Sequence, residues 1–77
     1  MSEKTWMAPY LVIGDEITTT LNGSDLCVSK IDRRDDPYFA SVVHEGKVVA
    51  TGLFLSLPAA RQWCEAISMK GVCNEKV

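Results

Sequence analysis

The dipeptide Asn22-Gly23 constrains the fold of this chain more than any other feature of its sequence. Asparagine followed by glycine accepts the positive φ angles that a two-residue type I′ turn requires. Such a turn pairs Leu21 with Ser24, Thr19 with Leu26 and Ile17 with Val28. One face of the hairpin then carries Ile17, Thr19, Leu21, Leu26 and Val28, and the other carries Thr18, Thr20, Asp25, Cys27 and Ser29. The turn and the apolar alternation therefore predict the same register.

A second hairpin is predicted from Tyr38–His44 and Lys47–Leu55, with Glu45-Gly46 as its two-residue turn. In that register one face holds Tyr38, Ala40, Val42, Val49, Thr51 and Leu53. The opposite face holds Phe39, Ser41, Val43, Val48, Ala50 and Phe54. Both faces are largely apolar, and one helix covers only one of them. The second face is expected to meet the N-terminal segment, a second copy of the chain or a partner protein.

A helix is predicted over residues 57–70, because Ser56 suits an N-cap and Pro58 falls in the first turn. Its apolar stripe consists of Ala60, Trp63, Cys64 and Ile67, and the residues predicted to lie away from that stripe are Arg61, Gln62, Glu65 and Ser68. Gly71 is a suitable C′ residue, and the tail 72–77 is expected to fray. Cys64 is expected to be a small buried hydrophobic residue.

The fold class that follows is α+β, with 1–77 as a single domain. An antiparallel meander of three to five strands within 16–55 precedes one C-terminal helix packed on one face. Residues 1–13 are predicted to be an edge strand or an arm, because Pro9 interrupts their apolar run. The chain has no basic, apolar leader and no run long enough to span a membrane, so a cytoplasmic location is expected.

Charge narrows the class of partner. The net charge is −2, and the segment from Asp15 to Glu45 holds seven acidic and three basic residues. Binding to nucleic acid relies on an excess of lysine and arginine, so direct nucleic-acid binding is not expected. The acidic loops are instead expected to contact a basic protein surface. The candidate partner-binding residues are Asp15, Glu16, Asp32, Asp35, Asp36, Tyr10 and Tyr38.

No catalytic, cofactor-binding or metal-binding set is predicted. His44 is the sole histidine and is expected to be an exposed residue beside a turn. The cysteines Cys27, Cys64 and Cys73 have neither a paired metal-ligand spacing nor an even number. Cys73, near the C-terminus, is expected to be the most exposed thiol. The sequence therefore favours a protein that is not an enzyme and uses no cofactor.

The C-terminal half of the sequence resembles small accessory proteins of phages and prophages. The resemblance lies in four runs, Tyr38–Val43, Glu45–Lys47, Gly52–Leu57 and Ala60–Glu65. It implies a compact sheet with a helix that binds and blocks a host protein, as anti-CRISPR inhibitors block nucleic-acid-handling complexes. The alternative is a homodimeric structural or regulatory domain, in which the two-sided hairpin Tyr38–Leu55 forms the interface by sheet face or edge.

Overall fold

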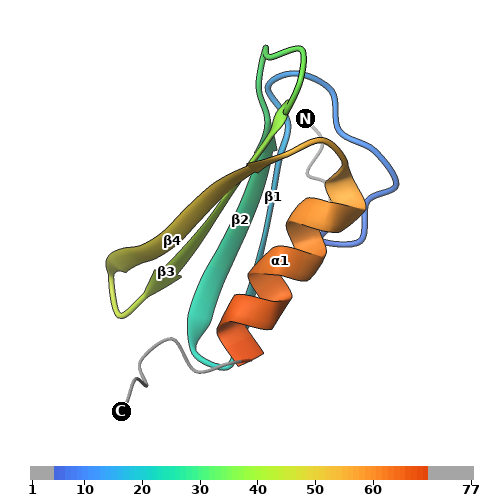
Figure 1. Ribbon diagram of the computed structural model, residues 1–77. Helices are drawn as coiled ribbons and strands as arrows, with labels where there is room; N and C mark the ends of the chain where they lie inside the picture. Colours follow the sequence, from blue (N-terminus) through green and yellow to red (C-terminus); the bar gives the residue numbers. More distant parts are fainter. Residues whose placement is uncertain (1–4, 70–77) are drawn as a thin grey trace.

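The computed structural model describes residues 5–69. Four strands precede one helix along the chain: β1 (Glu16–Leu21), β2 (Ser24–Lys30), β3 (Tyr38–His44), β4 (Lys47–Phe54) and α1 (Leu57–Met69). The strands form one antiparallel sheet in the order β1-β2-β3-β4, and α1 lies across one face of it (Figure 1). The predicted α+β meander with a C-terminal helix is therefore confirmed.

The β1–β2 hairpin has the predicted register. Leu21 pairs with Ser24, and the ladder continues to Glu16 and Ser29. The turn residues Asn22 and Gly23 have φ angles of 54° and 81°, which are the positive values of a type I′ turn. Local turn chemistry and apolar alternation are sufficient to fix this hairpin.

The β3–β4 hairpin departs from its predicted register after the first two pairs. Val43 pairs with Val48 as expected, but Val42 pairs with Ala50 because a β-bulge leaves Val49 as an extra residue. Every later residue of β4 is therefore displaced by one position. The prediction that Thr51 and Leu53 share a face with Ala40 and Val42 is wrong, and the residues that do so are Ala50, Gly52 and Phe54.

The helix begins as predicted. The amide of Ala59 donates to Oγ of Ser56 at 3.3 Å, so Ser56 caps the first turn. Ser68, predicted to lie away from the apolar stripe, is instead buried, and its hydroxyl donates to the carbonyl of Leu21. Ser68 follows Cys64 by four residues and so lies on the same helix face. Lys70, the predicted last residue, lies outside the described residues, as do Gly71, Cys73 and the tail 72–77.

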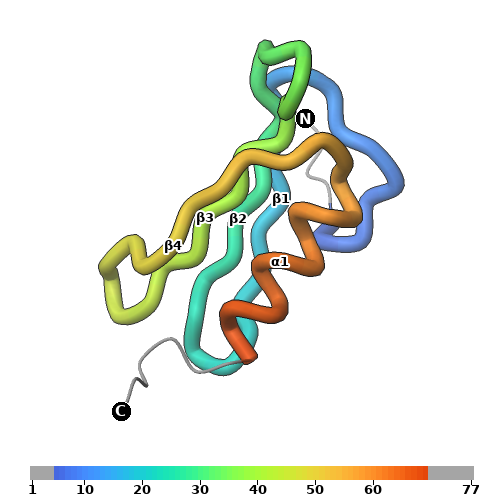
Figure 2. The backbone as a smooth tube through the Cα atoms, viewed as in Figure 1, coloured from blue at the N-terminus to red at the C-terminus, as the bar shows by residue number. Residues whose placement is uncertain are grey.

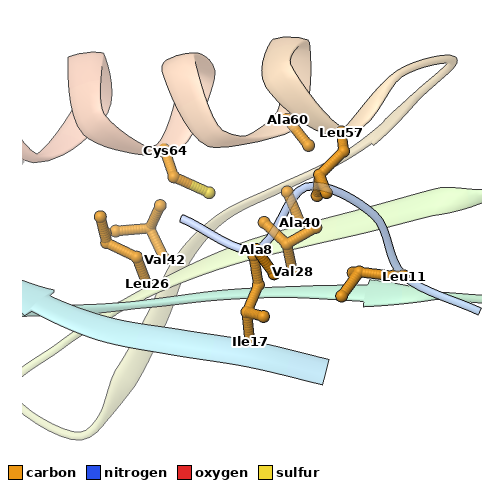
Figure 3. Packing of buried hydrophobic residues seen from close by; sticks show 10 residues of the cluster. All are labelled: Ala8, Leu11, Ile17, Leu26, Val28, Ala40, Val42, Leu57, Ala60 and Cys64. Atoms are coloured by element: carbon orange, nitrogen blue, oxygen red, sulfur yellow. The ribbon is translucent and has the colours of Figure 1, made fainter. Parts of the chain in front are cut away.

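The core lies between the inner face of the sheet and α1 (Figure 3). The helix contributes Leu57, Ala60 and Cys64. The predicted burial of Cys64 is confirmed. The sheet contributes two buried rows of side chains. The first row runs from β1 to β3 and consists of Ile17, Val28 and Ala40, and the second, on β2 and β3, consists of Leu26 and Val42. Phe54 and Trp63 close one side, with ring centroids 5.2 Å apart.

The described part of the N-terminal segment is an arm and contains no strand. It runs beside α1 on the helix side of the sheet (Figure 2) and buries Ala8 and Leu11 against the core. Two long-range bonds hold the arm. Nε1 of Trp6 donates to Oε2 of Glu65 at 2.8 Å, and Nη1 of Arg61 donates to the carbonyl of Ala8 at 2.9 Å. The alternative of an edge strand is therefore wrong for residues 5–13.

Candidate partner-binding surface

The two acidic loops adjoin at one end of the sheet, called here the acidic end. Asp15 and Glu16 open β1, and Asp32, Asp35 and Asp36 lie between β2 and β3. The amide of Gly14 donates to the carbonyl of Lys30, and the amide of Lys30 donates to the carbonyl of Asp15. The two loops meet at the top of the sheet in Figure 2. The fold thus brings together acids that lie up to 21 positions apart in sequence.

Three of these five carboxylates accept hydrogen bonds from other groups of the same chain. Oδ2 of Asp15 accepts the amide of Val12 at 3.0 Å, and Oε2 of Glu16 accepts the Cys27 thiol at 2.8 Å. Oδ1 of Asp36 accepts Nε of Arg33 at 2.6 Å, and this bond raises the pKa of Arg33. Asp32 and Asp35 are exposed on the loop. These two are therefore the acids best placed to contact a partner.

The two candidate tyrosines occupy different places. Tyr10 lies on the arm and is exposed. Tyr38 opens β3 on the helix side of the sheet, where it is half-buried and packs against the core. Nζ of Lys30 lies 4.9 Å from the centroid of the Tyr38 ring, within the range of a cation–π contact. Tyr38 therefore has a structural role that the sequence did not indicate.

The face of the sheet opposite α1, called here the outer face, carries no other element of the described chain (Figure 1). Three cross-strand rows make it up: Glu16–Ser29–Phe39–Leu53, Thr18–Cys27–Ser41–Thr51 and Thr20–Asp25–Val43–Val48. Its β1 and β2 half is mainly polar. Its β3 and β4 half carries an outer apolar patch, defined as Phe39, Val43, Val48 and Leu53.

The outer apolar patch is accessible to solvent. Val48 is 63% exposed and Leu53 is 41% exposed, while Phe39 and Val43 on the inner strand β3 are half-buried. The sequence indicated that both faces of this hairpin are apolar, but it placed Leu53 on the same face as Ala40 and Val42, which the structure shows to be the covered face. The signal that could have corrected this is Gly52, because a glycine suits a position that faces a helix closely. A Cβ at Gly52 would lie 3.0 Å from the Phe54 ring and 3.6 Å from the ring of Trp63 on α1.

The thiol of Cys27 lies in the middle of the outer face. Burial, reinforced by the hydrogen bond and charge of Glu16, raises the pKa of Cys27 to about 12. The side chain therefore remains a protonated thiol at neutral pH and acts as a donor to Glu16. This contact supplies no nucleophile, because the reactive form of cysteine is the thiolate.

His44 stands next to the β3–β4 turn, as predicted, but it is half-buried rather than exposed. Its Nδ1 lies 3.1 Å from Oγ of Ser24, and its Nε2 lies 3.8 Å from Oε2 of Glu45. Ser24 is only 1% exposed, so its hydroxyl is not accessible to a substrate. The pair links the ends of the two hairpins rather than forming a nucleophile with its base.

Among residues 5–69 no pocket was found, and no group of three potential ligands could hold a metal ion. The same residues contain no helix with the length and apolar character needed to cross a membrane. The candidate site in residues 5–69 is therefore a surface and not a pocket. Its most distinctive part is the acidic end together with the adjoining outer face.

Comparisons with protein-family models, curated proteins and solved structures gave no match for this chain.

Proposed function

We propose that this protein is a non-catalytic module that binds a partner protein. The observation that carries the proposal is the outer apolar patch, which faces solvent on a sheet whose other face is already covered by α1 and the arm. The patch consists of two apolar pairs, Phe39–Leu53 and Val43–Val48, with the Ser41–Thr51 pair between them. Exposed apolar side chains bordered by polar groups are typical of protein-binding surfaces. The threonines of β1 and the carboxylates of the acidic end provide that surround.

The negative charge of the acidic end predicts that the contacting surface of the partner is positively charged. The row that contains Phe39 and Leu53 is the outer-face row nearest to the loop of Asp32 and Asp35, because Tyr38 follows that loop directly. An apolar patch bordered by exposed carboxylates fits a partner with an apolar contact flanked by lysine or arginine. Charge of this kind speeds association and selects the partner, while the apolar patch supplies most of the affinity.

Within this class we place the protein among phage inhibitors of host nucleic-acid-handling complexes of the CRISPR type. The resemblance of its C-terminal half to phage accessory proteins supports this placement, and so do the two acidic loops at one end. A groove that binds phosphate is basic, so clustered carboxylates are suited to occupy it. The proposal locates the protein in the cytoplasm of the host cell and requires no direct contact with nucleic acid.

The charge part of the proposal is tested with two matched single variants. Asp35→Lys reverses an exposed acid of the acidic end, and Glu45→Lys makes the same change of charge in the β3–β4 turn at the opposite end of the sheet. Capture of the stoichiometric partner from a bacterial lysate, quantified by native mass spectrometry, should fall at least about tenfold for the first variant only. Equal capture by both variants would exclude the acidic end as a contact.

The apolar part is tested with one residue from the patch. Phe39→Thr places a β-branched residue, which suits a strand, in β3 and removes the ring from the outer face. Ile13→Thr removes an exposed apolar side chain from the arm and serves as the control. We expect partner capture to drop for Phe39→Thr and to stay at the wild-type level for Ile13→Thr, with both proteins still folded by circular dichroism. Undiminished capture by folded Phe39→Thr would overturn the proposed surface.

A further inference from the structure

Strand β4 is an open edge of the sheet. Its only strand neighbour is β3, so the backbone groups along its other side have no strand partner within residues 5–69. Edge strands of monomeric proteins usually carry charges, prolines or β-bulges that hinder pairing with another chain. From Val48 to Phe54 this strand contains no charge and no proline, and its bulge lies at Val49, near the start of the strand. Val48 and Val49 are instead exposed β-branched residues, which favour further strand pairing.

The sequence of β4 is also complementary to itself. With Thr51 on a two-fold axis, an antiparallel partner places Val49 opposite Leu53 of the second copy, and Leu53 opposite Val49. All these residues lie on the outer side, where apolar pairs and threonine pairs stabilise a ladder. On the inner side, Ala50 faces Gly52, and both are small enough to leave the helices room. Shifting the axis to Ala50 would instead oppose Leu53 with Lys47.

The distribution of charge favours the same arrangement. Antiparallel pairing sends the two acidic ends to opposite ends of the assembly, which minimises repulsion between copies of net charge −2. It also brings Lys47 of each copy beside the end of the other copy's β4. Phe54 there pairs with Tyr38, the residue that follows the acidic β2–β3 loop. A basic residue of one copy thus approaches the acidic end of the other.

We propose that two copies of this chain pair through β4, antiparallel and centred on Thr51, to form one continuous sheet. The pairing covers Val49–Leu53 and so begins at the bulged residue, Val49. It leaves both outer faces on the same side of the sheet, so two partner-binding surfaces lie side by side. The inference is independent of the proposed function, because a dimer of this kind forms whether or not the outer face binds a partner.

The test uses charge at the proposed axis. Thr51 is exposed, so Thr51→Lys and Thr51→Glu leave the core intact. Each variant alone opposes two like charges at the axis and should weaken the dimer by about fivefold or more, whereas an equimolar mixture should recover dimerisation by pairing lysine with glutamate. The measurement is sedimentation equilibrium of the full chain from micromolar to submillimolar concentrations.

The matched control is Thr18→Lys, which introduces the same charge on the outer face at the other edge strand, β1. We expect this variant to dimerise like the wild-type protein. A wild-type protein that stays monomeric throughout the range would overturn the inference. So would a dimer that Thr18→Lys weakens while Thr51→Lys does not, because the interface would then lie at β1. Failure of the mixture to recover dimerisation would exclude Thr51 as the axis.

Discussion

At the scale of single residues, the two described cysteines are held as thiols by their surroundings. Burial is the largest cause for both, and Glu16 and Glu65 add to it, so that the pKa rises from 9.0 to about 12 for Cys27 and to about 11 for Cys64. Each thiol is a donor in the structure, to Glu16 and to the carbonyl of Ser41 respectively. The folded state therefore keeps protons that the unfolded chain releases at lower pH.

This difference predicts a loss of stability in alkali. The raised thiol pKa values stabilise the folded state fully below pH 9.0, the pKa of a cysteine in the unfolded chain. This stabilisation is lost as the pH rises toward about 12. We expect the free energy of unfolding, measured with urea, to fall over this range. Cys27→Ser keeps a donor for Glu16 but does not titrate there, so its stability should decline less steeply than that of the wild type. Parallel declines would show that Cys27 does not contribute.

At the scale of elements, the bulge at Val49 decides which side chains of β4 face the helix. Deleting Val49 removes the extra residue and leaves Ala50, Gly52 and Phe54 on the inner side. We expect this variant to keep its fold, with unfolding free energy within about 1 kcal/mol of wild type. Deleting Thr51 also removes the bulge, but it turns Val49, in place of the smaller Ala50, toward the helix, and this overpacking should cost about 2 kcal/mol.

Urea denaturation followed by circular dichroism compares the two deletions directly, since each removes one residue from the same strand. A more stable Thr51 deletion would contradict the observed register. The prediction from sequence failed at this bulge for a physical reason. Both faces of the β3–β4 hairpin are apolar. A one-residue shift in the register of β4 therefore still places apolar side chains toward the helix, and the sequence does not distinguish the two registers. The β1–β2 hairpin has only one apolar face, and there the same reasoning fixed the register.

The helix shows a similar division. Its N-cap and the burial of Cys64 follow from spacing and local chemistry, and both were predicted. The burial of Ser68 was not predicted, because a serine is assigned to the exposed side of a helix unless a buried acceptor for its hydroxyl is known. The acceptor is the carbonyl of Leu21, which is 47 residues away in the chain. The convergence of the two acidic loops likewise depends on strand order, and the internal partners of Glu16 and Asp36 could be assigned only from the folded arrangement.

At the scale of the whole molecule, the arm completes the core by fastening onto the helix. We expect Trp6→Phe to lower the free energy of unfolding by about 1 kcal/mol, because it removes the partly buried hydrogen bond to Glu65 but keeps an aromatic ring. Urea denaturation of this variant, of Glu65→Ala and of the double variant forms a thermodynamic cycle. Strictly additive losses in the cycle would show that the two side chains do not interact.

The order of the strands also has a consequence for how fast the chain folds. Each strand pairs only with the strand next to it in sequence, so every ladder closes a short loop and can form rapidly. The contact between Trp6 and Glu65 spans 59 positions and needs the helix in place first. We therefore expect folding to proceed from the two hairpins outward. The sheet and helix are expected to assemble before the arm, so that docking of the arm is the last kinetic step and the first to reverse.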